Sequence, residues 1–385
     1  MTDSAGSDHR YGWAMGAAAF DVDVMVGDLG RLVDVESPSR DVDALTRSAN
    51  VLADLMRVTL GSDPELVAGP AGPHVHWRGG DRPRVLVVGH HDTVFPLGSL
   101  AARPFTVRDG RATGPGVFDM KGGIVTAIHA VASLADRRGV ELLFTCDEEV
   151  GSLTSRQLIE ERAAACGQVL VLEPAADRGA VKIGRKGVGM YDVEVAGRAA
   201  HAGLEPEKGV NALVEAAHQV LAIIRIARPE LGTTVTPTVA HAGTAENVVP
   251  AGAVVRVDVR VTSLDEAARV DKEFGTLSPV DPQATVSVSG GVNRPPMPVE
   301  SSVGLFAAAQ EAAAAIGIGP VEGVSVGGGS DGNFTAALGI PTLDGLGVVG
   351  GGAHADHEWV DISSLPERAA LLAALIAVLD PSVSR

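Results

Sequence analysis

The sequence predicts an α/β protein with a mostly parallel sheet and a smaller inserted domain. Between about residues 85 and 172, short apolar strands alternate with helical stretches, a pattern typical of parallel sheets covered by helices. From residue 187 the pattern changes to half-buried strands, and near residue 294 it returns to the first style. We therefore expect a discontinuous large domain, 1–186 and 294–385, that encloses a domain of residues 187–293.

The spacing of apolar residues predicts the helices and strands of the large domain. Helical patterns fill residues 21–60. The strands and helices expected next lie at 85–91 (strand), 122–138 (helix), 141–149 (strand and turn) and 168–174 (strand and turn). After residue 294 the sequence predicts an alanine-rich helix, a loop at 325–334, a strand within 341–346 and a helix from Leu365. Active sites of such sheets lie beyond the carboxyl ends of the strands, so residues just past those ends are candidates.

The inserted domain has its own order of elements. Strands are expected at 188–197, 233–243, 247–261 and 284–290, and helices at 209–227 and 263–274. A serine at position 263 is a typical helix N-cap. The resulting β-α-β-β-α-β order predicts a ferredoxin-like fold.

Composition limits the classes of partner. The chain has 385 residues, 45% of them apolar, and a formal charge of −17. Such a surface repels phosphate backbones and anionic membranes, so neither nucleic acid nor a membrane is an expected partner. The two cysteines, Cys146 and Cys166, are too few for a disulfide scaffold and are expected in the core. No apolar run is long enough for a membrane span, and the N-terminus does not resemble a secretory signal, so we expect a cytoplasmic protein.

The stretch "VVGHHDTVFP" places two histidines and an aspartate at the end of a predicted strand. Because side chains alternate along a strand, His90 and Asp92 share one face, and His91 points the other way. A metal-binding histidine usually donates its second N–H to a carboxylate, and His90 with Asp92 suits that pairing. A strand-end histidine beside a capping aspartate is the alternative. The earlier pair in "HVHW", His74 and His76, is expected on a plain edge strand, because no carboxylate accompanies it.

Four more stretches carry acids or a histidine just past a strand or in a loop. They contain Asp119, Glu148 with Glu149, Glu173, and His354. Each has a structural alternative: a helix N-cap, a solvated acidic turn, a strand terminator or an exposed loop residue. Those alternatives do not explain why all of them occur where an α/β sheet would gather them at one edge. The combination therefore favours a metal centre.

Two histidines and three carboxylates suit zinc, with cobalt or manganese as substitutes, and suit two ions better than one. One carboxylate can bridge the ions, and a bridging hydroxide would leave the site neutral. Two such ions can acidify a water and polarise a carbonyl, while one unligated acid carries the proton. The adjacent Glu148 and Glu149 could divide these roles, because neighbouring side chains diverge.

These motifs give the sequence a resemblance to a known family. In order, they are H-x-D-T-V, G-x-x-D-M-K-G, D-E-E-x-G-S, L-E-P and A-H-A-D. From about residue 25 to the end, the chain resembles the dizinc metallopeptidases that include glutamate carboxypeptidase, aminoacylase, acetylornithine deacetylase and succinyl-diaminopimelate desuccinylase. The resemblance implies one zinc on His90, Asp119 and Glu173, and a second on Asp119, Glu149 and His354, with Asp119 bridging. It also implies that Asp92 orients His90, and that Glu148 takes a proton from the metal-bound water and gives it to the leaving amine.

The inserted domain is similar to the lid of glutamate carboxypeptidase, most closely at residues 197–216. The resemblance implies that His201 reaches a substrate carbonyl oxygen as an oxyanion donor, usually from the partner subunit. It implies that Asn247 and Arg260 grip the substrate carboxylate. Arg294 either joins them or forms a salt bridge at the domain junction. A homodimer through this lid is therefore expected.

The leading hypothesis is a metallocarboxypeptidase-type amidohydrolase whose substrate is a small peptide or N-acyl amino acid with a free α-carboxylate. Glu173 favours it, because family members of the tripeptidase and dipeptidase type more usually carry aspartate there. An N-acyl amino acid deacylase is the alternative. An aminopeptidase or dipeptidase is less supported, because no acid that would hold a free substrate amine stands out. A catalytically inactive metal-binding homologue is disfavoured by the presence of Glu148.

Overall fold

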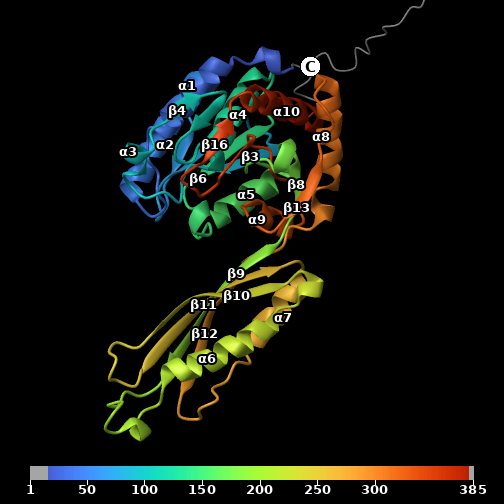
Figure 1. Ribbon diagram of the computed structural model, residues 1–385. Coiled ribbons are helices and arrows are strands. Elements are labelled where there is room, and N and C mark those ends of the chain that lie inside the picture. Colours follow the sequence, from blue (N-terminus) through green and yellow to red (C-terminus); the bar gives the residue numbers. More distant parts are fainter. Residues whose placement is uncertain (1–15, 381–385) are drawn as a thin grey trace, which may run out of the picture. The chain divides into compact units, whose positions relative to one another are not determined.

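The computed structural model describes residues 16–380 as two compact units (Figure 1). The first unit contains the described residues up to Gly184, together with Val299–Ser325 and the residues from Ser330 onward. The second unit contains Arg185–Pro298 and the short loop Val326–Gly329. The N-terminal segment, which we did not expect to be a secretory signal, lies mainly outside the described residues.

A six-stranded sheet forms the centre of the first unit, in the order β1-β2-β6-β3-β7-β14. Four strands run parallel: β6 (Val140–Thr145), β3 (Val85–His90), β7 (Val169–Val171) and β14 (Thr342–Leu343). The other two, β1 (Glu65–Val67) and β2 (His74–Arg78), add antiparallel strands at one side. The mostly parallel sheet predicted from the sequence is confirmed.

Alternate residues of the strands feed two hydrophobic cores. Val85 and Val87 join the core made with α1 (Val22–Val33), α2 (Val42–Leu60), α4 (Gly122–Ser133), α8 (Val303–Ile316) and α10 (Ser364–Leu379). Leu86 and Val88 join the smaller core that includes α5 (Arg156–Cys166). Helices therefore cover both faces of the sheet, as expected for near-continuous apolar strands.

Smaller elements complete the first unit. A second sheet has the order β15-β16-β5-β4. Its strands are β15 (Gly350–Gly351), β16 (Trp359–Asp361), β5 (Arg111–Thr113) and β4 (Thr106–Arg108). The short helices are α3 (Ser99–Ala102) and α9 (Gly332–Ala337), and β8 (Val181–Arg185) pairs with β13 (Gly323–Val326).

The second unit is an antiparallel sheet with two helices, and its ferredoxin-like order is the predicted one. The strand order is β10-β11-β9-β12. In chain order the elements are β9 (Gly187–Ala196), α6 (Ala212–Ile223), β10 (Thr234–Ala242), β11 (Gly252–Val261), α7 (Leu264–Phe274) and β12 (Thr285–Arg294). One core cluster unites apolar residues of both helices with the inward side chains of the strands. Asn211 and Ser263 cap the two helices through side-chain oxygens.

The strand that contains "HVHW" lies inside the sheet. The interpretation of this stretch as a plain edge strand is wrong, because β2 lies between β1 and β6 and both histidines are buried. The carboxylate of Glu141, which lies far along the sequence, is 2.9 Å from the Nε2 atom of His76.

Among the described residues, no helix is both long and apolar enough to cross a membrane.

Candidate metal centre and active site

Three parallel strands deliver the central residues of the site to one edge of the large sheet. β3 ends at His90, which pairs with Thr145 at the end of β6. The loop after β6 carries Glu148 and Glu149, and Glu173 follows β7 by two residues. Parallel pairing aligns the carboxyl ends of these strands, which is why residues far apart in sequence meet here.

The two histidines face opposite oxygens of one aspartate. His90 Nε2 lies 3.2 Å from Asp119 Oδ1 and 3.8 Å from a Glu173 oxygen. His354 Nε2 lies 3.4 Å from Asp119 Oδ2 and 3.1 Å from a Glu149 oxygen. The structure thus brings together all five residues that the sequence predicted as ligands, with Asp119 in the middle.

This donor set fits two divalent cations. Ligand atoms about 2.0–2.1 Å from a tetrahedral zinc are about 3.3 Å from one another, close to most of the separations between these nitrogen and oxygen atoms. Imidazole nitrogen with carboxylate oxygen suits zinc and similar transition metals, whereas calcium and magnesium prefer oxygen alone. Candidate ligand atoms of His90, Glu148 and Glu173 lie within 4.8 Å of one another, as do those of His90, Asp119 and Glu149. Carboxylates this close repel each other unless cations lie between them.

The electrostatics of the site point in the same direction. Burial raises the pKa of Asp119, but hydrogen bonds from His354 and His90 outweigh burial and leave that pKa below its usual value. The hydrogen bond to Asp119 is the largest of the effects that raise the pKa of His354 to about 10. Burial lowers the pKa of His90, and its bonds to Asp119 and Asp92 more than reverse this, so the pKa lies well above 6.5. A bound cation would favour the same negative charge on Asp119 and would compete with the protons of the two histidines.

Asp92 links the histidine strand to the loop of the two glutamates. His90 Nδ1 lies 3.0 Å from the backbone oxygen of Asp92 and 3.4 Å from its carboxylate. Since both are acceptors, Nδ1 carries the proton in a neutral ring and Nε2 keeps its lone pair for a metal. The Asp92 carboxylate also accepts the backbone N–H groups of Glu148 and Glu149, each at 3.2 Å, and the hydroxyl of Ser39 at 2.6 Å.

A third buried group of potential ligands is unsuited to metal. His74, Cys146 and Asp147 lie within 4.8 Å of one another. Burial raises the pKa of the Cys146 thiol and lowers the pKa of His74. His74 Nδ1 accepts the Cys146 N–H at 3.3 Å. A protonated thiol is a poor ligand, so Cys146, like Cys166, is a core residue.

The predicted lid residues occupy two ends of the sheet in the second unit. Arg260 and Arg294 lie on either side of Val188, near the start of β9. His201 follows the other end of β9 and pairs with Val248, while the Ala202 N–H donates to the Asn247 oxygen. Because a strand rises about 3.3 Å per residue, Val188 and Ala196 at the two ends of β9 are roughly 26 Å apart. Within one chain, therefore, Asn247 lies with His201 and not with Arg260.

Both ends of this sheet carry side chains that can donate hydrogen bonds. His201 Nδ1 accepts the N–H groups of Gly203 and Leu204 at 3.1 and 3.2 Å. The neutral ring then keeps its proton on Nε2, as a hydrogen-bond donor. Arg260 makes two hydrogen bonds to Asp258 and one to the Gly327 oxygen, whereas Arg294 is buried.

Comparison with known proteins adds the deciding observation. The model of Peptidase family M20/M25/M40 matches residues 86–378. The chain belongs to this peptidase family. It is therefore a metal-dependent peptidase or amidohydrolase, and the resemblance described above is confirmed.

Individual family members show how far the similarity extends. Carboxypeptidase G2 of Pseudomonas sp. (strain RS-16) is 33% identical over 94% of this chain and 90% of the relative. A succinyl-diaminopimelate desuccinylase of Gluconacetobacter diazotrophicus is 30% identical over 77% of this chain and 82% of the relative. The crystal structure of a Staphylococcus aureus tripeptidase superposes with a TM-score of 0.74 at 20% identity, over 93% of this chain and 98% of that one. At that identity the tripeptidase supports the fold alone.

Sequence reasoning missed two residues that hold the site of this peptidase in place. Ser39 bonds to Asp92 from 53 positions away. The Glu358 carboxylate binds the backbone of the loop that carries Asp119. Neither leaves a periodic signal, although Glu358 lies only four positions after His354 in the sequence.

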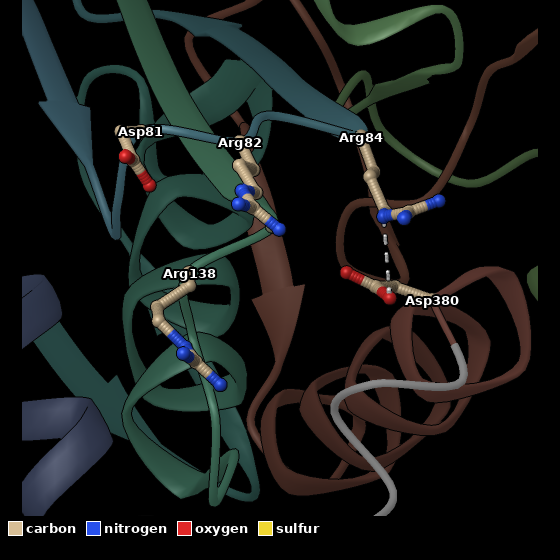
Figure 2. Close-up of a pocket in the computed structure, with 6 residues that line it drawn as sticks. Asp81, Arg82, Arg84, Arg138 and Asp380 are labelled. Carbon is tan, nitrogen blue, oxygen red and sulfur yellow. Dashed lines mark ion pairs between the residues drawn. The ribbon is translucent and has the colours of Figure 1, made fainter.

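A separate cavity of about 330 Å³ lies among arginines at the opposite edge of the large sheet (Figure 2). Arg84 precedes β3 and Gly139 precedes β6, so the cavity is at the amino ends of the strands. An ion pair of 3.7 Å joins Arg84 to Asp380 (Figure 2). Active sites of this sheet type lie at the carboxyl edge, where His90 is.

Proposed function

We propose that this family member is a metallocarboxypeptidase that releases an amino acid with a free α-carboxylate from a peptide or N-acyl substrate. The observation that carries the proposal is the position of Asp119 between two histidines, with Glu148 beside them. The 33% identity to carboxypeptidase G2 across nearly the whole chain supports the carboxypeptidase direction.

Two zinc ions, or cobalt or manganese in their place, would complete the centre. His90, Asp119 and Glu173 would hold one ion, and Asp119, Glu149 and His354 the other. When bound, such ions supply Lewis acidity toward the substrate carbonyl and lower the pKa of water. Asp92 keeps the Nδ1 proton of His90 in place, so that Nε2 remains available as a ligand.

Glu148 is the proposed proton carrier. It accepts a proton from the attacking water and donates one to the nitrogen of the leaving amino acid, so the amide C–N bond breaks with no net proton change on the enzyme. Its backbone N–H is held by the Asp92 carboxylate at 3.2 Å. That bond fixes the start of the side chain next to His90.

Arg260 and Arg294 are the proposed partners of the substrate carboxylate. A guanidinium can hold a carboxylate through two parallel hydrogen bonds. Asp258 already orients the Arg260 guanidinium through two bonds of 3.0 and 2.8 Å. The arginine therefore loses little conformational freedom when it turns a remaining N–H to the substrate.

A second subunit is the proposed source of His201 and Asn247. These residues sit at the far end of β9 from the two arginines, so one lid does not offer both pairs to one small substrate. The surface of α6 and of the turn that follows it supports a homodimer, because it exposes an apolar stripe of Leu213, Val214, Leu221 and Ile224, each about half accessible. The strand beside it, β10, is an edge strand with free pairing capacity.

The alternative function is an N-acyl amino acid deacylase. It is favoured by the similarity to succinyl-diaminopimelate desuccinylases, 30% identical over 77% of this chain. Both functions use the same amide-cleaving centre and differ in the acyl group that is accepted.

A substrate panel separates these functions. The zinc-loaded protein would be given acyl-glutamates, N-acetyl amino acids and dipeptides blocked at either end, with and without chelator. Chelator-sensitive release of a C-terminal amino acid, with carboxyl-blocked substrates inert, is the expected result. Cleavage of N-acetyl substrates alone would favour the deacylase, and activity that survives complete metal removal would contradict both.

The Arg260→Ala variant tests the carboxylate clamp. Loss of a bidentate charged contact, worth about 1.5–3 kcal/mol, should raise KM about 10–100-fold for substrates with a free carboxylate. Substrates with an amidated carboxyl terminus should lose much less. Arg256→Ala is the matched control, because Arg256 lies on the same face of β11 and is more exposed, pairing with Asp192. Equal losses for both kinds of substrate would contradict the clamp.

A further inference from the structure

Glu358 is a buried carboxylate bound almost entirely to backbone. Only 2% of the residue is exposed. One of its oxygens accepts the Gly116 N–H at 2.8 Å, and the other accepts the N–H groups of Phe118 and Asp119, both at 2.9 Å. Three charge-assisted bonds from one short loop fix the backbone of Asp119 itself.

The loop that receives Glu358 has a conformation that needs such a partner. Gly116 adopts a left-handed φ of 75°, and a Cβ there would approach Thr93 to 2.6 Å. The buried ammonium of Lys121 attracts Glu358 electrostatically and donates to the Val35 oxygen at 2.9 Å. Burial raises the pKa of Glu358 to about 7, while the peptide dipoles and the nearby cation favour its charged form.

Glu358 also shares a loop with a predicted metal ligand. The segment between β15 and β16 begins after Gly351 and ends before Trp359, and it carries both His354 and Glu358. Two turns stiffen it: Ala355 N–H donates to the Gly352 oxygen at 2.9 Å, and Glu358 N–H to the Ala355 oxygen at 3.1 Å. One end of this loop therefore presents a ligand, and the other end grips the loop of Asp119.

We propose that Glu358 is a positioning residue that sets the distance between Asp119 and His354, and so preforms the cation site that these two share with Glu149. The proposal rests on the ligand assignment under the proposed function. His90 and Glu173 reach the centre from β3 and β7, so the other cation site depends on Glu358 only through Asp119. A defect at Glu358 should therefore weaken one ion more than the other.

The test is metal titration of Glu358→Gln in the apo protein. An amide can accept hydrogen bonds only at its oxygen, and its NH₂ group would face one of the N–H donors of the loop. We expect wild type to bind two Co²⁺ ions. In the variant, the affinity for the more weakly bound ion should be about 10–100-fold lower than in wild type, as for other groups that orient ligands. Equilibrium dialysis and visible absorption of Co²⁺ give the two affinities separately, without any assay of activity.

Asp356→Asn is the matched control. It removes one negative charge from the same loop by the same change of carboxylate to amide, and its side chain is 92% exposed. It should bind both ions as wild type does. Wild-type affinity in Glu358→Gln, equal weakening of both ions, or equal weakening in the two variants would overturn the proposal. A purely structural role would lower the unfolding temperature of the apo protein without separating the two ions.

Three further outcomes have defined meanings. If Glu358→Gln does not fold, hydrogen exchange of the metal-free wild type decides: protected amides in 114–121 support a preformed loop, and exchange at the rate of an exposed loop overturns it. A wild type that binds two ions and hydrolyses no member of the substrate panel contradicts the proposed function and leaves the role of Glu358 standing. A wild type that binds fewer than two ions overturns both.

Discussion

Glu148 and Glu149 are neighbours in the chain, yet their surroundings differ. Candidate ligand atoms of Glu148 lie near those of His90 and Glu173, while the Glu149 carboxylate is 3.1 Å from His354. Asp92 holds both backbone N–H groups, so the turn that separates the two side chains is fixed. The same acid pair can thus supply a metal ligand and a proton carrier.

The Glu148→Gln and Glu149→Gln variants should therefore differ in kind. Glu148→Gln should keep two metal ions and lose about 10²–10⁴-fold in kcat, because a general base is removed. Glu149→Gln should lose metal as well as activity. Metal content by atomic emission and kcat on the best panel substrate measure both. Substantial turnover by Glu148→Gln would remove Glu148 as the base.

Residues that act through side-chain chemistry were easier to predict than residues that hold the backbone. The sequence indicated His90, Asp119, Glu149, Glu173 and His354, and the structure gathers them; their role as ligands stays a prediction. Ser39 and Glu358 were missed because a hydroxyl or carboxylate that binds a distant loop has no required spacing in sequence. Buried contacts of this kind become visible only when the chain is folded.

Among the elements, α7 shows how one side chain ties a helix to a sheet. Ser263 caps the helix by accepting the Glu266 N–H at 3.2 Å. The Glu266 carboxylate accepts two hydrogen bonds from Arg269 and one from Thr233, which precedes β10. The hydrogen bond from Arg269 is the largest cause that lowers the pKa of Glu266 from 4.5 to about 2.

The Glu266→Gln variant should therefore destabilise the second unit in a pH-dependent way. A carboxylate whose pKa is lower in the folded than in the unfolded protein stabilises the fold at pH values above its unfolded pKa. The contribution of Glu266 is therefore present above pH 4.5 and is lost as the pH falls toward about 2. We expect a loss of about 1–3 kcal/mol at pH 7 and a smaller difference from wild type at pH 3. Urea unfolding at both pH values measures it. Asp265→Asn, an exposed neighbour, is the control, and an equal loss at both pH values would contradict this account.

Helices and strands were predictable where the apolar residues follow one regular spacing. The alternation of apolar strands and helices gave the parallel strands β3, β6 and β7, and period-two patterns gave the strands of the second unit. The position of β2 was not predictable, because its order in the sheet depends on pairing with β6 across more than sixty residues. Buried His76 of this strand has the partner Glu141, which no local pattern indicates.

At the scale of the whole molecule, the apolar stripe on α6 is an exposed surface feature of the second unit. A glutamate at Leu221 should keep the helix, because glutamate is a good helix former, and should disrupt burial of the stripe in a dimer. We expect wild type to be a dimer and Leu221→Glu a monomer in light scattering after size exclusion. Val58→Glu is the control, since Val58 is an exposed residue of α2 in the first unit. A monomeric wild type would contradict the dimer.

The length of β9 has a genetic consequence. If each lid delivers His201 to the partner's centre, a subunit without Glu148 can still complete the site of a subunit without His201. Mixing the inactive variants Glu148→Gln and His201→Ala, with subunit exchange, should restore about a quarter of wild-type activity, because half of the dimers would be mixed and each would hold one intact site. Two defects in separate chains would complement each other in a mixed dimer, whereas a dimer of a doubly defective chain with a wild-type chain would hold no intact site.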